Sequence, residues 1–135
     1  MAKITPYIIF AGNCREALKF YQQCLGGELH LQRISESPMA VWTPAGKAGR
    51  ILHGSLISRN ITILAADMKM ETIVAGNNVQ LCLDCESAQE LESSFNSLSS
   101  EGAVITPLHQ TFRGNSYGEF TDRFGVSWIL NYTKH

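Results

Sequence analysis

The chain has 135 residues, 44% of them hydrophobic and 17% charged, which favours one folded domain with a sizeable core and excludes disorder. Eleven basic and twelve acidic residues give a net charge of -1, and the absence of a Lys/Arg run argues against nucleic acid or a membrane surface as partner. The longest apolar run near the start, residues 7–11, is too short for a signal sequence or a membrane span. Four cysteines without an export signal predict free thiols and a cytoplasmic location.

The first half of the chain begins with a strand and a helix. Residues 4–10 are mostly apolar, as in a central strand. Asn13, with Glu16 three residues later, predicts a capping box at a helix start, and Gly26-Gly27 ends that helix. The elements expected after it are a strand at 28–35, a loop rich in Ser, Pro and Gly at 35–49, a hairpin of strands 51–58 and 61–67 around Arg59-Asn60, and a connector at 68–78.

The second half repeats this order. Ser87 and Glu90 predict another capping box, and Leu91, Phe95 and Leu98 form the apolar stripe of a helix that ends at Gly102. In the segment Asp122-Arg-Phe-Gly125, Asp opens a turn and Gly supplies a positive φ. Strands are expected at 79–84, 104–109, 117–121 and 126–132.

The two halves match at steady separations in the sequence. The helix caps and stripes are 74 positions apart, as Asn13 is from Ser87, whereas the hairpin turns are 65 apart, as Asn60 is from Gly125. The first half therefore carries about nine extra residues in its 35–49 loop. We expect an α+β fold, in which residues 1–135 form a single domain of two βαβββ modules, about 1–67 and 79–135.

An ordered set of motifs then points to a family. The motifs are Pro6-Tyr-Ile-Ile-Phe-Ala-Gly-Asn-Cys-Arg-Glu-Ala-Leu-Lys-Phe-Tyr21, Leu25-Gly-Gly27, Ile51-Leu-His-Gly-Ser-Leu56, Thr111-Phe112 and Asp122-Arg-Phe-Gly-Val-Ser-Trp128. The chain resembles the PhnB-like branch of the vicinal oxygen chelate superfamily, which includes glyoxalase I, extradiol dioxygenases, and the bleomycin and fosfomycin resistance proteins. The resemblance implies cupped mixed sheets with helices on the outer face, a cavity and a homodimer. Members of this branch are often labelled demethylubiquinone methyltransferases, but no glycine-rich nucleotide loop follows a strand here, so we set that activity aside.

The resemblance also addresses metal binding. In metal-binding relatives four side chains converge on the cavity, and these positions correspond to Pro6, Leu64, Gln80 and Ile129. Three of the four side chains have no donor atom, and Gln80 offers one neutral oxygen. We therefore expect no metal and no cofactor.

Strand alternation divides the side chains between two faces of each sheet. Those expected to face the helices are Tyr7, Ile9, Leu52, Leu56, Ile61, Ile63, Leu81, Leu83, Val126, Trp128 and Leu130. The candidates for lining a ligand cavity on the opposite faces are Ile8, Phe10, His53, Ser55, Thr62, Gln80, Cys82, Ser127 and Asn131. The same pattern fits a solvated sheet face. Arg113, where this branch often has Trp, is a further candidate for anion binding or a solvated loop residue.

Other chemical candidates are weaker. His53 is a candidate general base, but no acid on its strand orients it, which favours a hydrogen-bonded structural role. Alternation sends the two thiols of Cys82-Leu-Asp-Cys85 to opposite faces, against a zinc or redox site. Cys14 and Cys24 are about 15 Å apart along a helix, too far for a disulfide. Met39 and Trp42 are interpreted as a lid or a packing anchor.

The preferred functional hypothesis is a PhnB-like protein that binds a small organic molecule in an apolar cavity without a metal. The alternative is a divalent-metal-dependent lyase, isomerase or dioxygenase of the glyoxalase type, and a purely partner-binding role also stays open. The identity of the ligand and the occurrence of any reaction are left open.

Overall fold

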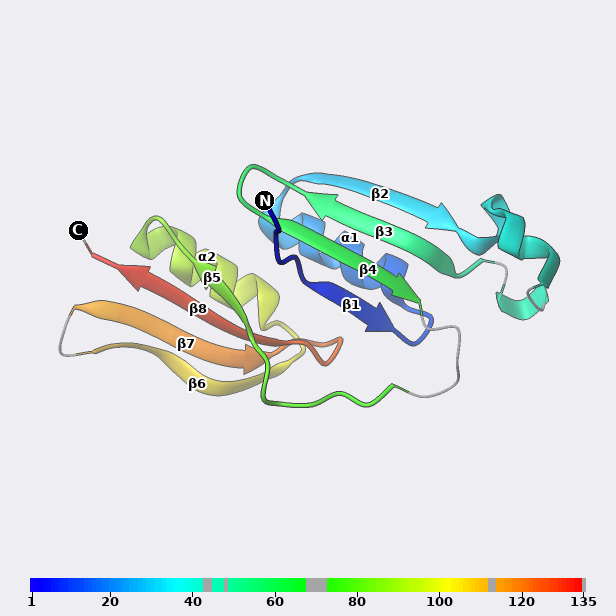
Figure 1. The fold of residues 1–135 in the computed structure, drawn as a ribbon. Helices are drawn as coiled ribbons and strands as arrows, with labels where there is room; N and C mark the ends of the chain where they lie inside the picture. Colours follow the sequence, from blue (N-terminus) through cyan, green and yellow to red (C-terminus); the bar gives the residue numbers. More distant parts are fainter. Residues whose placement is uncertain (43–44, 48, 68–72, 112–113, 135) are drawn as a thin grey trace. The chain divides into compact units, whose positions relative to one another are not determined.

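The computed structural model of the protein describes residues 1–42, 45–47, 49–67, 73–111 and 114–134. It divides into two compact units, Met1–Val74 and Ala75–His135, each with the order βαβββ (Figure 1). The first unit contains β1 (Tyr7–Phe10), α1 (Cys14–Leu25), β2 (Glu28–Arg33), β3 (Ile51–Ile57) and β4 (Thr62–Asp67). The second contains β5 (Leu81–Asp84), α2 (Ala88–Leu98), β6 (Ala103–Gln110), β7 (Asn115–Thr121) and β8 (Ser127–Thr133).

Each unit has one four-stranded mixed sheet. The strand order is β1-β4-β3-β2 in the first sheet, here sheet A, and β5-β8-β7-β6 in the second, sheet B. The first and last strands of each unit, β1 with β4 and β5 with β8, are parallel neighbours. The helix and the hairpin lie between them in the sequence and bring the chain back in the same direction. The other pairs are antiparallel. Each helix packs against one face of its own sheet (Figure 1). The expected α+β class is therefore confirmed.

A glycine lets the helix of each unit approach the middle of its sheet. A Cβ added to Gly54 on β3 would lie 2.7 Å from Leu18 Cδ1 of α1, and one added to Gly118 on β7 would lie 2.6 Å from Phe95 Cε2 of α2. A side chain at either position would force Leu18 or Phe95 to shift, and both are buried in the core, so glycine suits this close approach. The helix stripes themselves are buried, with Leu18 at 0% and Phe95 at 5% exposure.

The core of the second unit is aromatic. Phe120 on β7 contacts Phe95 edge-on at 5.1 Å between ring centroids and stacks on Trp128 at 6.4 Å. Trp128 is 3% exposed, and its indole N–H donates to Asp122 Oδ2 over 2.9 Å. The expected orientation of β8, with Trp128 and Leu130 toward the helix, is confirmed.

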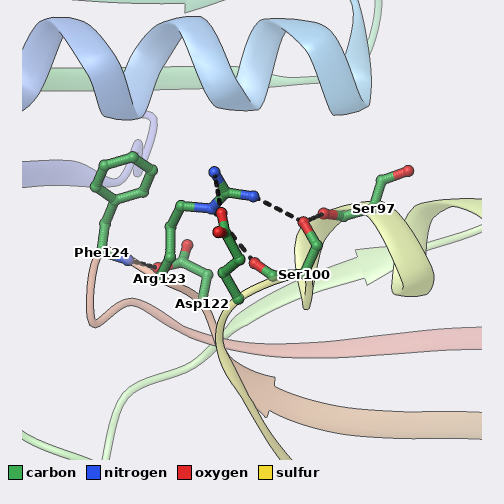
Figure 2. Close-up of polar contacts among 6 residues, drawn as sticks. Ser97, Ser100, Asp122, Arg123 and Phe124 are labelled. Atoms are coloured by element: carbon green, nitrogen blue, oxygen red, sulfur yellow. Dashed lines mark hydrogen bonds and ion pairs between the residues drawn. The ribbon is translucent and has the colours of Figure 1, made fainter.

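The turn between β7 and β8 forms as expected. Asp122 Oδ1 accepts hydrogen bonds from the backbone N–H groups of Phe124 and Val126, and Gly125 has φ 86°. Figure 2 shows how the neighbouring Arg123 reaches the end of α2, where it donates to the Ser100 carbonyl and hydroxyl. Arg123 also forms a 2.8 Å ion pair with Glu101. These contacts hold the Asp122–Gly125 turn against the C-terminal end of α2.

The two helix starts differ from each other. Ser87 caps α2 by accepting from the Glu90 N–H, as expected, and the Glu90 carboxylate accepts from the Glu86 N–H. Asn13 is the N-cap residue of α1, as predicted, but the predicted capping box is wrong, because the Asn13 side chain makes no capping hydrogen bond. Asp67, at the end of β4, replaces it by accepting from the N–H groups of Gly12 and Cys14, and a carboxylate there also complements the helix dipole.

The 35–49 loop contains short structured turns. Its elements are the 3₁₀ helices η1 (Ile34–Glu36), η2 (Pro38–Trp42) and η3 (Ala45–Lys47). β2 ends at Arg33, before the expected residue 35, where its pairing with β3 shifts register. None of the helices in the described ranges has both the length and the apolar character needed to cross a bilayer.

Candidate functional site

The face of sheet A opposite α1, here called open face A, carries the first group of candidate residues. The strand registers place Tyr7, Leu64, Ser55 and His30 in one row across the sheet. His53 and Thr62 share this face by alternation, as expected. Their exposure varies, since His53 is exposed whereas Ser55 is 8% exposed.

The orientation expected for β1 is wrong. Ile8 pairs with Ala65, which in turn pairs with Gly54 beneath α1, and Phe10 is 3% exposed. These two cavity candidates therefore lie on the helix side of the sheet. Tyr7 and Ile9, expected there instead, lie on open face A with 49% and 42% exposure.

Tyr7 and His53 form a polar pair on open face A. The Tyr7 hydroxyl lies 3.4 Å from His53 Nδ1, and the ring centroids are 6.0 Å apart with a 41° tilt. This distance is long for a hydrogen bond to a hydroxyl, so the contact orients the imidazole loosely. The sequence predicted a hydrogen-bonded His53, and the structure gives it a polar contact with Tyr7. The sequence analysis did not identify this partner, because it placed Tyr7 on the helix side of the sheet.

The face of sheet B opposite α2, open face B, is more polar. Gln80 Nε2 donates to Glu119 Oε2 over 3.3 Å, and Asn131 Nδ2 donates to Asp84 Oδ1 over 3.0 Å. Cys82 lies between these pairs, with its Sγ 3.9 Å from Asp84 Oδ1. Ser127 shares this face by alternation and is 9% exposed.

The polar groups Glu119, Asp84, His109 and Tyr117 were missed by the sequence reasoning. His109 and Tyr117 make an edge contact at 4.3 Å between ring centroids, and His109 Nδ1 lies 2.9 Å from the Pro107 carbonyl. Tyr117 and Glu119 alternate with the buried Gly118 and Phe120 on β7. That alternation was the signal that would have placed both side chains on the open face.

Three of the four positions that correspond to metal ligands in relatives lie on the open faces. These are Leu64, Gln80 and Ile129, whereas Pro6 precedes Tyr7 and has the opposite alternation. Thr5, not Pro6, has the alternation of open face A. Within the described part of the chain, no group of three or more His, Cys, Asp or Glu side chains is arranged to hold a metal ion.

All four cysteines are free thiols, in agreement with the sequence. Burial, with the negative charges of Asp67 and Glu16, raises the pKa of Cys14 to about 12. Burial, with nearby carboxylates, raises the pKa of Cys85 to about 11. Burial and then the Asp84 charge raise the pKa of Cys82. A high pKa makes a thiol a poor nucleophile and metal ligand at neutral pH, against a redox or zinc role for Cys82 and Cys85.

Three sequence-based candidates cannot be placed. Arg113 and the side chains of Met39 and Trp42 lie outside the described residues. Their expected roles, in anion binding or as a lid or packing anchor, stay predictions.

The two βαβββ units, each with a mixed sheet and one helix-covered face, define an α+β protein. The fold is shared with a glyoxalase/bleomycin resistance protein/dioxygenase family enzyme from Burkholderia phytofirmans PsJN, which is 16% identical with a TM-score of 0.62 over 95% of this chain and 97% of that chain. The family model described as 3-demethylubiquinone-9 3-methyltransferase matches residues 2–131, and the chain belongs to this PhnB-like family. It is 31% identical to Protein YjdN of Escherichia coli (strain K12) over 97% of this chain and 95% of that protein.

Solved structures agree with this assignment. Protein PA1353 from Pseudomonas aeruginosa is 36% identical, with a TM-score of 0.87 and 100% coverage of both chains. A putative 3-demethylubiquinone-9 3-methyltransferase, PhnB protein, from Bacillus cereus is 26% identical, with a TM-score of 0.81 over 98% of this chain and 100% of that chain. A lactoylglutathione lyase from Agrobacterium tumefaciens is 15% identical, with a TM-score of 0.58 over 98% of this chain and 94% of that chain, and shares the fold alone.

Proposed function

We propose that this protein binds a small organic molecule on open face A, without a metal. The observation that carries the proposal is the combination of exposed apolar side chains and one polar pair on a sheet face that α1 does not cover. Tyr7, Ile9 and Ile57 are 49%, 42% and 45% exposed, and Tyr7 contacts His53. Apolar surface with a few polar groups is the usual make-up of a small-molecule site.

The family supports a ligand-binding role without fixing the chemistry. One structure with this fold, from Burkholderia phytofirmans PsJN, is described as a glyoxalase/bleomycin resistance protein/dioxygenase family enzyme, a name that covers several different functions. The fold is therefore a scaffold whose function depends on the residues of the open faces. On open face A those residues offer apolar contact and hydrogen bonds, and no strong nucleophile.

A fragment screen mapped by NMR tests the proposal. Uncharged aromatic and aliphatic fragments should shift the methyl resonances of Ile9, Ile57 and Leu64 and raise the thermal midpoint, since they bind the native state. Ile9→Glu places a charge on open face A and should abolish these shifts. Lys19→Glu, on the exposed side of α1, is the matched control and should leave them intact. Fragments that bind Ile9→Glu as well as they bind the wild type would refute the proposal.

The alternative, a divalent-metal enzyme, has one observation in its favour. Gln80 and Glu119 place an amide and a carboxylate within 3.3 Å on open face B, and oxygen ligands suit hard cations. An ion needs several converging ligands to replace its lost water, and the described side chains offer no cluster of three ionisable ligands.

Metal retention distinguishes the two functions. Protein purified without a His-tag and exposed to equimolar zinc, nickel, manganese or iron(II) should hold little metal after desalting, with an unchanged thermal midpoint. Near-stoichiometric retention that is lost in both Gln80→Ala and Glu119→Gln would overturn the metal-free proposal and favour the enzyme. Asp84→Asn on the same face is the control variant.

We also propose a homodimer. The outer strands are β1 and β2 in sheet A and β5 and β6 in sheet B. Of these, β6 carries Val104 and Ile105 with 50% and 60% exposure. Uncovered apolar strand edges favour association. Light scattering after size exclusion at micromolar concentration should give about twice 14.9 kDa. A mass of one chain at this concentration would exclude the dimer.

A further inference from the structure

We infer that the ligand of open face A carries a carbonyl or carboxylate oxygen, which accepts a hydrogen bond from His53, on an apolar or aromatic body. The inference rests on the proposed binding function and specifies which molecules the same site selects. It follows from the hydrogen-bonding state of the Tyr7–His53 pair, from the charges on the face and from its apolar neighbours.

The direction of the Tyr7–His53 hydrogen bond decides which ring nitrogen carries the proton of a neutral imidazole. The Tyr7 hydroxyl and His53 Nδ1 lie 3.4 Å apart, and the direction of their hydrogen bond depends on the imidazole tautomer. We take Tyr7 as the donor, because the phenol O–H is more acidic than the N–H of a neutral imidazole. The imidazole proton then resides on Nε2, which becomes a donor directed away from Tyr7. A protonated imidazole also donates at Nε2. Both states therefore offer an N–H at this nitrogen, and both favour an acceptor oxygen as partner.

The acidic groups of sheet A are placed away from this donor. Its four strands contain two acids, Glu28 and Asp67. The Asp67 carboxylate is 4% exposed and accepts from the N–H groups of Gly12, Cys14 and Ile51 on the helix side. Glu28 shares open face A but lies at the start of β2, where it pairs with Ile57, four residues along β3 from His53, and it is 3.8 Å from His30. Neither acid is arranged to balance a cationic ligand beside His53, so a ligand amine gains no ion pair there.

The apolar part of the ligand has its own contact surface. Tyr7 pairs with Leu64 on the neighbouring strand, and Ile9 follows two residues later on the same face. The exposed fractions of Tyr7 and Ile9, 49% and 42%, leave apolar area that a flat hydrocarbon skeleton can cover. Burying this area supplies affinity, while the Nε2 donor supplies selectivity.

Four naphthalene probes of similar size test the inference on the full chain. They are 2-naphthoate, 2-acetylnaphthalene, 2-methylnaphthalene and 2-naphthylmethylamine, titrated by following the methyl resonances of Ile9, Ile57 and Leu64. One net hydrogen bond predicts that at least one of the two oxygen-bearing probes binds about 3- to 10-fold tighter than the hydrocarbon and the amine. The two oxygen probes separate carboxylate from carbonyl recognition.

Variants identify the donor. His53→Ala should reduce the affinity for the oxygen-bearing probes to that for 2-methylnaphthalene, which should itself bind as before. His53→Gln, which keeps an N–H donor, should restore part of the preference. Tyr7→Phe keeps the ring but removes the hydroxyl that orients the imidazole, and should weaken the preference. Lys19→Ala, on the exposed side of α1, should change none of these affinities, and amide spectra check that each variant is folded.

The outcomes separate this inference from the proposed function. If all four probes shift the open-face methyls with equal affinity, or the amine binds tightest, the site stands and the ligand class is wrong. The same conclusion follows if the oxygen preference survives in His53→Ala. If no probe perturbs these methyls at millimolar concentration, both the binding function and the ligand class are refuted.

Discussion

Replacing Trp128 by Ala is expected to destabilise the second unit by about 3–5 kcal/mol, the usual cost of removing a buried aromatic side chain. Trp128 is 3% exposed and stacks on Phe120, so truncation leaves a cavity beneath α2. Its indole N–H also donates to Asp122 Oδ2, within a turn whose aspartate is 3% exposed. Trp128→Phe keeps most of the ring volume but removes this donor, and should cost about 1–3 kcal/mol.

Chemical denaturation followed by circular dichroism measures both effects as a lower midpoint at a similar slope. Ile129→Ala is the matched control, because Ile129 is the next residue of β8 and has the opposite orientation, with intermediate exposure. It should cost less than Trp128→Ala. An unchanged midpoint for Trp128→Ala, or a larger loss for Ile129→Ala, would show that the orientation of β8 is reversed and would remove the basis for open face B.

Two further predictions test the buried polar groups. Asp67→Asn should lower the free energy of unfolding by about 1.5–3 kcal/mol. The Asp67 carboxylate accepts three backbone N–H groups at 2.8 to 3.0 Å, and the amide nitrogen of Asn cannot accept a hydrogen bond. The exposed Asp84→Asn is the control, and equal denaturation midpoints for the two variants would contradict the role of Asp67. Native labelling with iodoacetamide at pH 8 should modify the exposed Cys82 well before the buried Cys14 and Cys85. Burial raises the pKa of Cys14 to about 12 and that of Cys85 to about 11, so few of these thiols are ionised at pH 8. Similar rates at all three cysteines, measured by mass spectrometry, would contradict this burial.

The element order was predictable from the sequence because local signals were strong. Helical stripes, the Ser87 cap and the Asp122–Gly125 turn each depend on neighbouring residues, and the structure confirms them. The cap of α1 was not predictable, because it comes from Asp67, which is 53 positions from Cys14. A carboxylate at a strand end gives no local sign that it will accept from a distant helix start.

The composition of open face B was only partly predictable, since the polar pairs join different strands. Gln80 meets Glu119 across 39 positions, and Asp84 meets Asn131 across 47. Gln80 and Asn131 were identified by alternation alone, whereas their acidic partners were not. A single strand pattern gives the face of a residue, but its cross-strand neighbour depends on register.

The reversed orientation of β1 has a definite physical origin. The segment Tyr7–Phe10 is apolar at every position, so alternation carries no information about its faces. The offset of 74 positions that relates the helices aligns Ile8 with Cys82, which lies on open face B. The strands match at an offset of 75 positions instead of 74. Ile8 pairs with Ala65, the partner of Gly54, just as Leu83 pairs with Leu130, the partner of Gly118, so Ile8 and Leu83 are equivalent. The connection from strand to helix is therefore one residue shorter in the second unit. A one-residue slip exchanges the two faces of a strand. This exchange brings Tyr7, instead of Ile8, onto the face of His53, and with it the polar pair on which the proposed ligand selectivity depends.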